Sequence, residues 1–133
     1  MLKIPKNITD KIVEQGLADS PVEACGILAG RNDLVEKIYL MTNADNSNEH
    51  FTMLPQEQFR VTKDIRSNGF EMLAIYHTHP ETPARPSQED IRMAFTAGVV
   101  YIIASLVNAE KPDIKGFLID DAKVEKVELE FVE

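Results

Sequence analysis

The residues with the clearest chemical potential lie in one segment, HTHPETPARPSQED, at positions 77–90. His77 and His79 are two positions apart at the end of an apolar run, and alternate residues of a β-strand point to the same face. Two neutral imidazoles that converge in this way form a natural pair of Zn²⁺ ligands. Asp90 follows one proline-rich loop later and could supply a third ligand, which leaves a coordination position for water. The segment indicates a candidate catalytic metal site.

Each of these residues also has a purely structural interpretation. A His-x-His pair at a strand end, taken alone, is more often packing or surface polarity than a metal site. Ser87 is a good N-cap for a helix, and Asp90 lies where a capping-box acid would hydrogen-bond back to the cap. The two interpretations are compatible for Ser87, whose hydroxyl could cap the helix and still face a metal-binding cavity.

A second carboxylate, Glu23, opens the otherwise apolar run VEACGILAG. Unless it is simply hydrated at the start of a strand, it faces a cavity or a partner, and burial would then raise its pKa toward the range of a general base. Cys25 would share its face on a regular strand. We expect Cys25 to be a small apolar core residue, since a catalytic thiol would need a nearby histidine. We expect His50 to lie at the surface in a polar loop.

Several other metal motifs are absent. There is no HExxH segment, and a single cysteine is incompatible with the PCxxC of zinc deaminases. Glu81 and Thr82 stand where metallo-β-lactamase-like sites have Asp-His. A TIM-barrel amidohydrolase needs about 250 residues. Two histidines and one carboxylate could also bind non-haem iron, although no co-substrate signature accompanies them.

The elements that must position these residues follow from hydrophobic periodicity. A first helix is predicted over about 5–18, a second from Pro55 to Asn68-Gly69, and a third from near Ser87. Strands are predicted over ACGILAG, LVEKIYLM, 51–54, EMLAIYHTH, VVYIIASLV, IKGFLID and KVELEFV. This intermingling predicts an α/β (α+β) class: one domain over residues 1–133, with a single mixed, largely antiparallel sheet flanked by helices.

Composition indicates the class of protein, the partners it could bind and the compartment in which it works. Hydrophobic residues make up 44% of the 133 residues, as in globular domains. The net charge of −8 argues against nucleic-acid binding, which needs clustered Lys and Arg. No apolar run approaches the length of a membrane span, and no secretory signal is evident. With one cysteine, we expect a cytoplasmic protein.

Taken together, PVEACGILAG, HTHP and PSQED resemble the JAMM (MPN+) metallopeptidases. Their pattern is a glutamate on an early strand, then His-x-His, seven residues and Ser-x-x-Asp. Residues 80–86 supply the seven, and the resemblance runs from about Pro21 to Phe95. It implies the MPN (cytidine-deaminase-like) fold, and the length is similar to that of the minimal, stand-alone prokaryotic members.

The resemblance also implies roles and partners. One Zn²⁺ per chain would be held by His77, His79 and Asp90, with Glu23 as the catalytic base and Ser87 stabilising the oxyanion. The implied reaction is hydrolysis of a peptide or isopeptide bond at the C-terminus of a ubiquitin-like or sulfur-carrier protein. Such a substrate has a Gly-Gly tail, and a carrier–cysteine adduct is one example.

Two alternatives come from relatives of the same family. Some MPN proteins have lost the metal and act as non-catalytic binding scaffolds, but here the whole ligand set is present. A DNA-repair-associated branch shares the signature but adds a helical DNA-binding domain, for which this short, acidic chain has no room.

Overall fold

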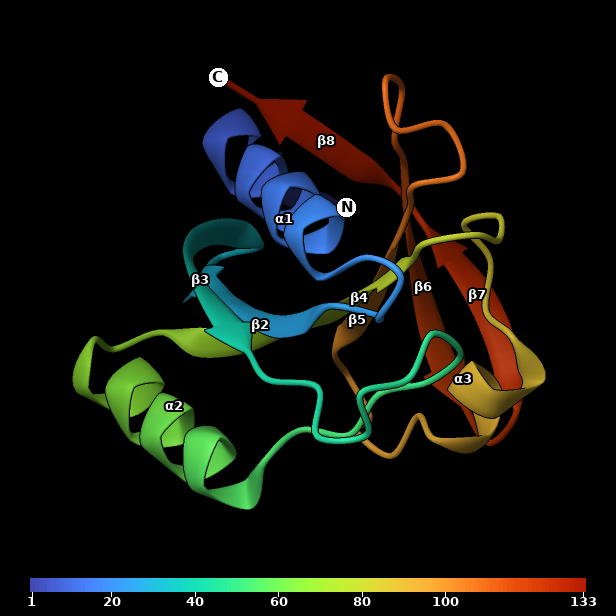
Figure 1. The fold of residues 1–133 in the computed structure, drawn as a ribbon. Helices are drawn as coiled ribbons and strands as arrows, with labels where there is room; N and C mark the ends of the chain where they lie inside the picture. Colours follow the sequence, from blue (N-terminus) through green and yellow to red (C-terminus); the bar gives the residue numbers. More distant parts are fainter.

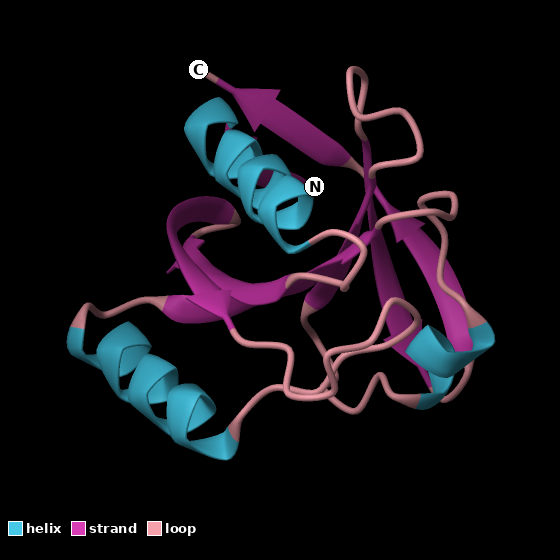
Figure 2. Cartoon of the chain, viewed as in Figure 1, coloured by secondary structure: helices cyan, strands magenta, loops and turns pink.

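The computed structural model describes residues 1–133, which form one eight-stranded sheet with helices on both of its faces (Figures 1 and 2). The strands are β1 (Leu2–Pro5), β2 (Cys25–Arg31), β3 (Leu34–Met41), β4 (Glu71–His79), β5 (Val100–Ser105), β6 (Asp113–Asp120), β7 (Lys123–Val127) and β8 (Leu129–Val132). The helices are α1 (Lys6–Asp19), α2 (Pro55–Ser67) and α3 (Gln88–Arg92). None of the helices has the length and apolar character needed to span a bilayer.

The strand order is β7-β6-β5-β4-β2-β3-β1-β8. Strand β4 runs parallel to β5, and β1 runs parallel to both β3 and β8. The other neighbouring pairs are antiparallel, so the sheet is mixed with an antiparallel majority. This is the architecture that the sequence predicted.

The sheet is strongly curved. Its two edge strands, β7 and β8, are separated in the chain only by Glu128. Seven strand spacings in a flat sheet would put these edges roughly 34 Å apart, so the sheet has to curl until β8 reaches β1. Helix α1 lies between β8 and β2 within this curve (Figure 1). Its inner face packs into the largest core cluster: Leu2, Ile4, Ile8, Ile12, Leu28, Val35, Ala74, Tyr76, Ile102 and Ala104.

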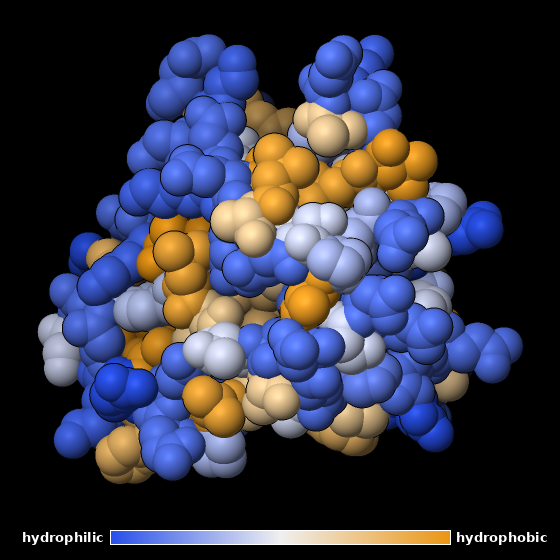
Figure 3. Space-filling view, viewed as in Figure 1, coloured by the Kyte–Doolittle hydropathy of each residue, from blue (hydrophilic) through white to orange (hydrophobic).

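The opposite face of the sheet is covered by α2 and by α3 with its flanking loops. Ile65 of α2 packs against Cys25, Ile27 and Met41, while Ile91 of α3 packs on the cluster over β5 and β6. On the view of Figure 3, apolar surface gathers near α1 and the loop after β5, and polar side chains surround it. The candidate site residues discussed below lie on the α2/α3 face.

Two predicted strands are wrong. The segment KVELEFV divides at Glu128 into β7, which pairs with β6, and β8, which pairs with β1 at the far edge. Its even alternation is the same for both partners, so only the curvature reveals the division. In the segment 51–54, Met53 forms an isolated bridge with Asn43 and no strand. Strand β1 was not predicted, because four residues before a helix show no distinctive period.

Candidate metal centre and active site

Strand β4 fixes the two histidines because it is paired on both sides near its end. His77 lies opposite Cys25 of β2 and Ile103 of β5, and His79 lies opposite Ser105. Both imidazoles are buried on the α2/α3 face. The period of two places them on one face, as the sequence predicted.

Helix α3 brings Asp90 to the histidines. The Ser87 N–H donates to Asp90 Oδ2 (2.9 Å), and the Asp90 N–H donates to Ser87 Oγ (3.0 Å), which completes a capping box. The same carboxylate has Oδ1 3.2 Å from His77 Nε2 and Oδ2 3.0 Å from His79 Nε2. Both interpretations of Asp90 therefore apply at once: the cap holds the side chain in position, and its oxygens face the imidazoles.

The donor atoms fit a single divalent cation. His77 Nε2 and His79 Nε2 are 3.1 Å apart, and each lies 3.0–3.2 Å from a different oxygen of the Asp90 carboxylate. Around a tetrahedral Zn²⁺ with bonds of about 2.0–2.1 Å, neighbouring ligand atoms lie about 3.3 Å apart. His79 Nδ1 is 2.8 Å from the Pro83 carbonyl oxygen, an acceptor only, so Nδ1 holds a hydrogen and Nε2 is the nitrogen that could bind a cation.

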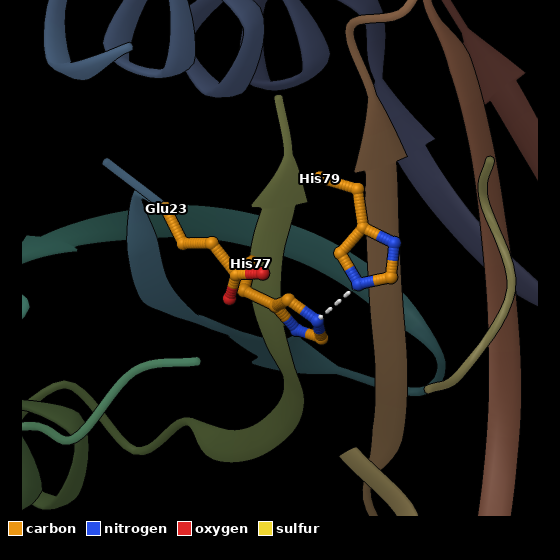
Figure 4. A group of neighbouring side chains, drawn as sticks. All are labelled: Glu23, His77 and His79. Atoms are coloured by element: carbon orange, nitrogen blue, oxygen red, sulfur yellow. Dashed lines mark hydrogen bonds between the residues drawn. The ribbon is translucent and has the colours of Figure 1, made fainter. Parts of the chain in front are cut away.

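Glu23 lies on the loop that leads into β2 and is only 2% exposed. One of its oxygens and one nitrogen of each imidazole all lie within 4.8 Å of one another. Figure 4 shows the carboxylate directed toward the His77 ring. Glu23 Oε1 and His77 Nδ1 are buried and have no hydrogen-bond partner in the protein. Since buried polar atoms are almost always paired, their concentration here is characteristic of a site that binds a ligand.

The surroundings shift the pKa values of the Glu23 and Asp90 carboxylates in opposite directions. Burial raises the pKa of Glu23 to about 8, although the nearby His79 opposes the shift. Burial would also raise the pKa of Asp90, but hydrogen bonds from His77 and His79 outweigh it and hold that pKa well below its usual range. A permanently ionised carboxylate suits a metal ligand, and one that titrates near neutrality suits proton transfer.

The pKa values of the two histidines also shift in opposite directions. Burial lowers the pKa of His77, whereas the hydrogen bonds from His79 to Asp90 and to the Pro83 carbonyl outweigh burial and raise the pKa of His79. In the metal-free protein, the pKa shifts of His79 and Asp90 favour the charged forms of both groups. A divalent cation would replace the proton on His79 and neutralise the same carboxylate.

An apolar cavity of about 230 Å³ adjoins His77 and Asp90. Its walls include Phe51, Met53, Ile75, Tyr101, Ile103 and Ile119. Phe51 stacks on His77 with ring centroids 4.9 Å apart and an interplanar angle of 29°. Sequence reasoning missed Phe51, for which an aromatic residue in a polar loop was the available signal. His50, expected at the surface, is half-buried at this cavity, and its Nδ1 is 3.0 Å from Asp45 Oδ2. Cys25 is fully buried in the core, as predicted.

Two solved structures share this fold. The DSY2949 protein of Desulfitobacterium hafniense superposes with a TM-score of 0.93 at 42% identity, covering 100% of this chain and 94% of that one. AF2198 of Archaeoglobus fulgidus, a JAB1/MPN domain protein, superposes with a TM-score of 0.65 at 23% identity, covering 98% of this chain and 97% of that one. The chain is therefore a JAB1/MPN-type α+β protein, and the predicted fold class is confirmed.

The family match is more specific. The model for prokaryotic homologs of the JAB domain matches residues 5–119, and the chain belongs to this family, the prokaryotic branch of the JAMM proteins. The CysO-cysteine peptidase of Mycobacterium tuberculosis is 29% identical over 100% of this chain and 92% of that protein. The desampylase of Pyrococcus furiosus is 27% identical over 96% of this chain and 89% of that protein. The resemblance seen in the sequence is confirmed.

Proposed function

We propose that this protein is a zinc-dependent peptidase that hydrolyses a peptide or isopeptide bond at the C-terminus of a ubiquitin-like or sulfur-carrier protein. The observation that supports it is the close approach of His77, His79 and the Asp90 carboxylate, with the buried Glu23 carboxylate beside the two imidazoles. The relatives' names support the hydrolase class and this class of substrate.

His77, His79 and Asp90 would hold one Zn²⁺ per chain. When bound, the ion polarises a carbonyl group and lowers the pKa of water to about 7. Glu23 takes a proton from the attacking water and delivers it to the leaving nitrogen. Its pKa of about 8 in the metal-free site allows it both to accept and to release that proton near neutral pH.

Ser87 would assist at the oxygen of the scissile carbonyl. Its Oγ accepts the Asp90 N–H, so the hydroxyl proton itself remains available for donation. As negative charge develops on the carbonyl oxygen, this proton would stabilise it. Removing one such donor typically costs on the order of 2.7–4 kcal/mol of transition-state stabilisation.

The substrate proposed is a carrier whose flexible tail ends in Gly-Gly, such as a carrier–cysteine adduct. Two glycines bring no side chains to the buried histidines, so the backbone can approach closely. We place the reaction in the cytoplasm and propose no nucleic-acid or membrane partner, consistent with the net charge of −8.

The test combines metal analysis with a matched variant. Purified protein should contain about one zinc per chain and should cleave a carrier–cysteine adduct, and chelation should abolish cleavage. Glu23→Gln should retain the zinc but lose about 10²–10⁴-fold in kcat, the usual contribution of a general base. The exposed, neighbouring Glu49 provides the control, because Glu49→Gln should retain normal activity. A wild-type protein that binds no zinc, or a Glu23→Gln variant with full activity, would refute the proposal.

A further inference from the structure

The proposed base lies just outside the strand ladder. Strand β2 begins at Cys25, so sheet pairing does not hold the Glu23 backbone. Its N–H donates to the Ser47 carbonyl (2.8 Å), and its carbonyl accepts from Asn43 Nδ2 (3.0 Å). Contacts from outside the ladder therefore decide where this side chain lies relative to the histidines.

Thr78 makes the first of these contacts from between the two histidines. It is fully buried on the α1 face. Its N–H donates to the Ala24 carbonyl (3.0 Å), and its Oγ1 accepts the Ala24 N–H (2.9 Å). The hydroxyl oxygen thus accepts a backbone N–H, as a backbone carbonyl does between paired strands. These two bonds link Ala24, the residue after Glu23, directly to Thr78, the residue between the two histidines.

Asn43 makes the second contact. Besides Glu23, its Nδ2 donates to the His50 carbonyl (3.0 Å) and more weakly to the Ser47 carbonyl (3.4 Å). Its Oδ1 accepts the N–H groups of Asp45 (3.0 Å) and Thr52 (3.3 Å). One amide therefore joins Glu23 to the loop whose Phe51 stacks on His77.

We propose that Thr78 and Asn43 are positioning residues that set the location of Glu23 relative to the metal-binding histidines. This inference rests on the proposed function, in which Glu23 transfers the proton. Proton transfer requires hydrogen-bond distance, and a displacement of about 1 Å can cost about 10²-fold in rate. Neither residue touches the reacting atoms, so both act through Glu23.

The first experiment compares Thr78→Val with Thr78→Ser. Valine keeps the shape but removes the acceptor, and serine keeps the acceptor. For Thr78→Val we expect kcat to fall about 10²-fold, with KM within about twofold of normal and zinc content unchanged. Thr78→Ser should stay within about threefold of wild type. The control is Thr9→Val, a buried threonine of α1 bonded only to Lys6, which should leave kcat unchanged.

A second readout needs neither zinc nor substrate. In metal-free protein, NMR hydrogen exchange of the Ala24 amide reports directly on its bond to Thr78. We expect exchange about tenfold faster in Thr78→Val and near-normal exchange in Thr78→Ser. If the wild-type protein cleaved no carrier adduct, the proposed function would be wrong, yet this measurement would still decide whether Thr78 tethers the Glu23 segment.

Asn43→Asp tests the other contact and covers the case in which Thr78→Val does not fold. Aspartate preserves the acceptor for Asp45 and Thr52 but cannot donate to the Glu23 carbonyl. The same signature is expected: reduced kcat, normal KM and full zinc content. The inference fails if Asn43→Asp, or a folded Thr78→Val, keeps normal kcat. It also fails if Thr78→Ser is as impaired as Thr78→Val, or if the loss of kcat follows a loss of zinc.

Discussion

The two faces of strand β4 treat buried polar groups in opposite ways. Toward α1, the Tyr76 hydroxyl donates to Gln15 Oε1 (2.6 Å) and Thr78 accepts the Ala24 N–H, so the polar atoms are paired inside the core. Toward α2 and α3, Glu23 Oε1 and His77 Nδ1 remain unpaired. The alternation of side chains along β4 thus puts the paired polar groups of the core on one face and the unpaired groups of the candidate site on the other.

The difference shows which face of the sheet tolerates buried polar atoms that have no hydrogen-bond partner. An unpaired buried polar atom destabilises a protein, whereas a paired one contributes modestly to stability. The α1 face avoids that cost, and the site face accepts it in a cluster of ionisable groups. Substitutions on the two faces should therefore separate into effects on activity and effects on folding, except at Thr78, whose hydroxyl on the α1 face bonds to the residue after Glu23.

The largest effect should come from a metal ligand on the site face. Asp90→Asn keeps an oxygen that can accept the Ser87 N–H, so α3 stays capped, but it weakens metal binding. Activity should fall by about 10³-fold or more, because the ion contributes several kcal/mol to the reaction. Zinc content and adduct cleavage measure this, with the exposed Asp113→Asn as control. Full zinc and full activity in Asp90→Asn would remove Asp90 from the ligand set.

The next effect belongs to the α1 face. Ile12 is fully buried in the core between α1 and the sheet, and Ile12→Ala should lower the free energy of unfolding by about 2–5 kcal/mol. Urea denaturation measures this loss. Below the unfolding transition, kcat should remain near normal. A large fall in kcat of the folded variant would show that the two faces are not separate.

A smaller effect is expected where the α1 face satisfies a polar group. Tyr76→Phe removes the donor to Gln15 and leaves Gln15 Oε1 without it. The expected loss of stability is about 0.5–1.5 kcal/mol, the net contribution of one hydrogen bond, because the half-buried Gln15 can still be reached by water. Thermal or urea unfolding of the pair Tyr76→Phe and Tyr39→Phe checks it, since Tyr39 is bonded near the surface. Equal, negligible losses would contradict the comparison.

The smallest effect concerns the pH dependence of the metal-free protein. The pKa of Glu23 is about 8 when folded, against 4.5 for the ordinary side chain, so the folded state binds more protons in between. Its stabilising contribution is complete below pH 4.5 and is lost as the pH rises through 8. Compared with Glu23→Gln, the wild type should lose stability progressively as the pH rises over this range. Parallel urea curves for the two proteins, without such a divergence, would disprove it.

Local sequence sufficed for the elements around the histidines. EMLAIYHTH coincides with β4, LVEKIYLM coincides with β3, and Pro55 begins α2. The pattern of Glu23, His-x-His and Ser-x-x-Asp identified the family, which the family match confirms. The individual roles of Glu23, Ser87 and the three ligands stay predictions. Periodicity and capping are short-range properties, and that is why they could be recognised in the chain alone.

Long-range geometry decided the rest. The division of KVELEFV between opposite sheet edges depends on the curvature around α1, and the alternation of that segment is identical for either partner. The contacts of Asn43 and Thr78 with the Glu23 segment, and the stacking of Phe51 on His77, join residues far apart in the chain. The sequence by itself determined which groups could perform the chemistry. Only the tertiary structure decided their burial, their pKa values and the residues that position them, because these depend on neighbours brought together by folding.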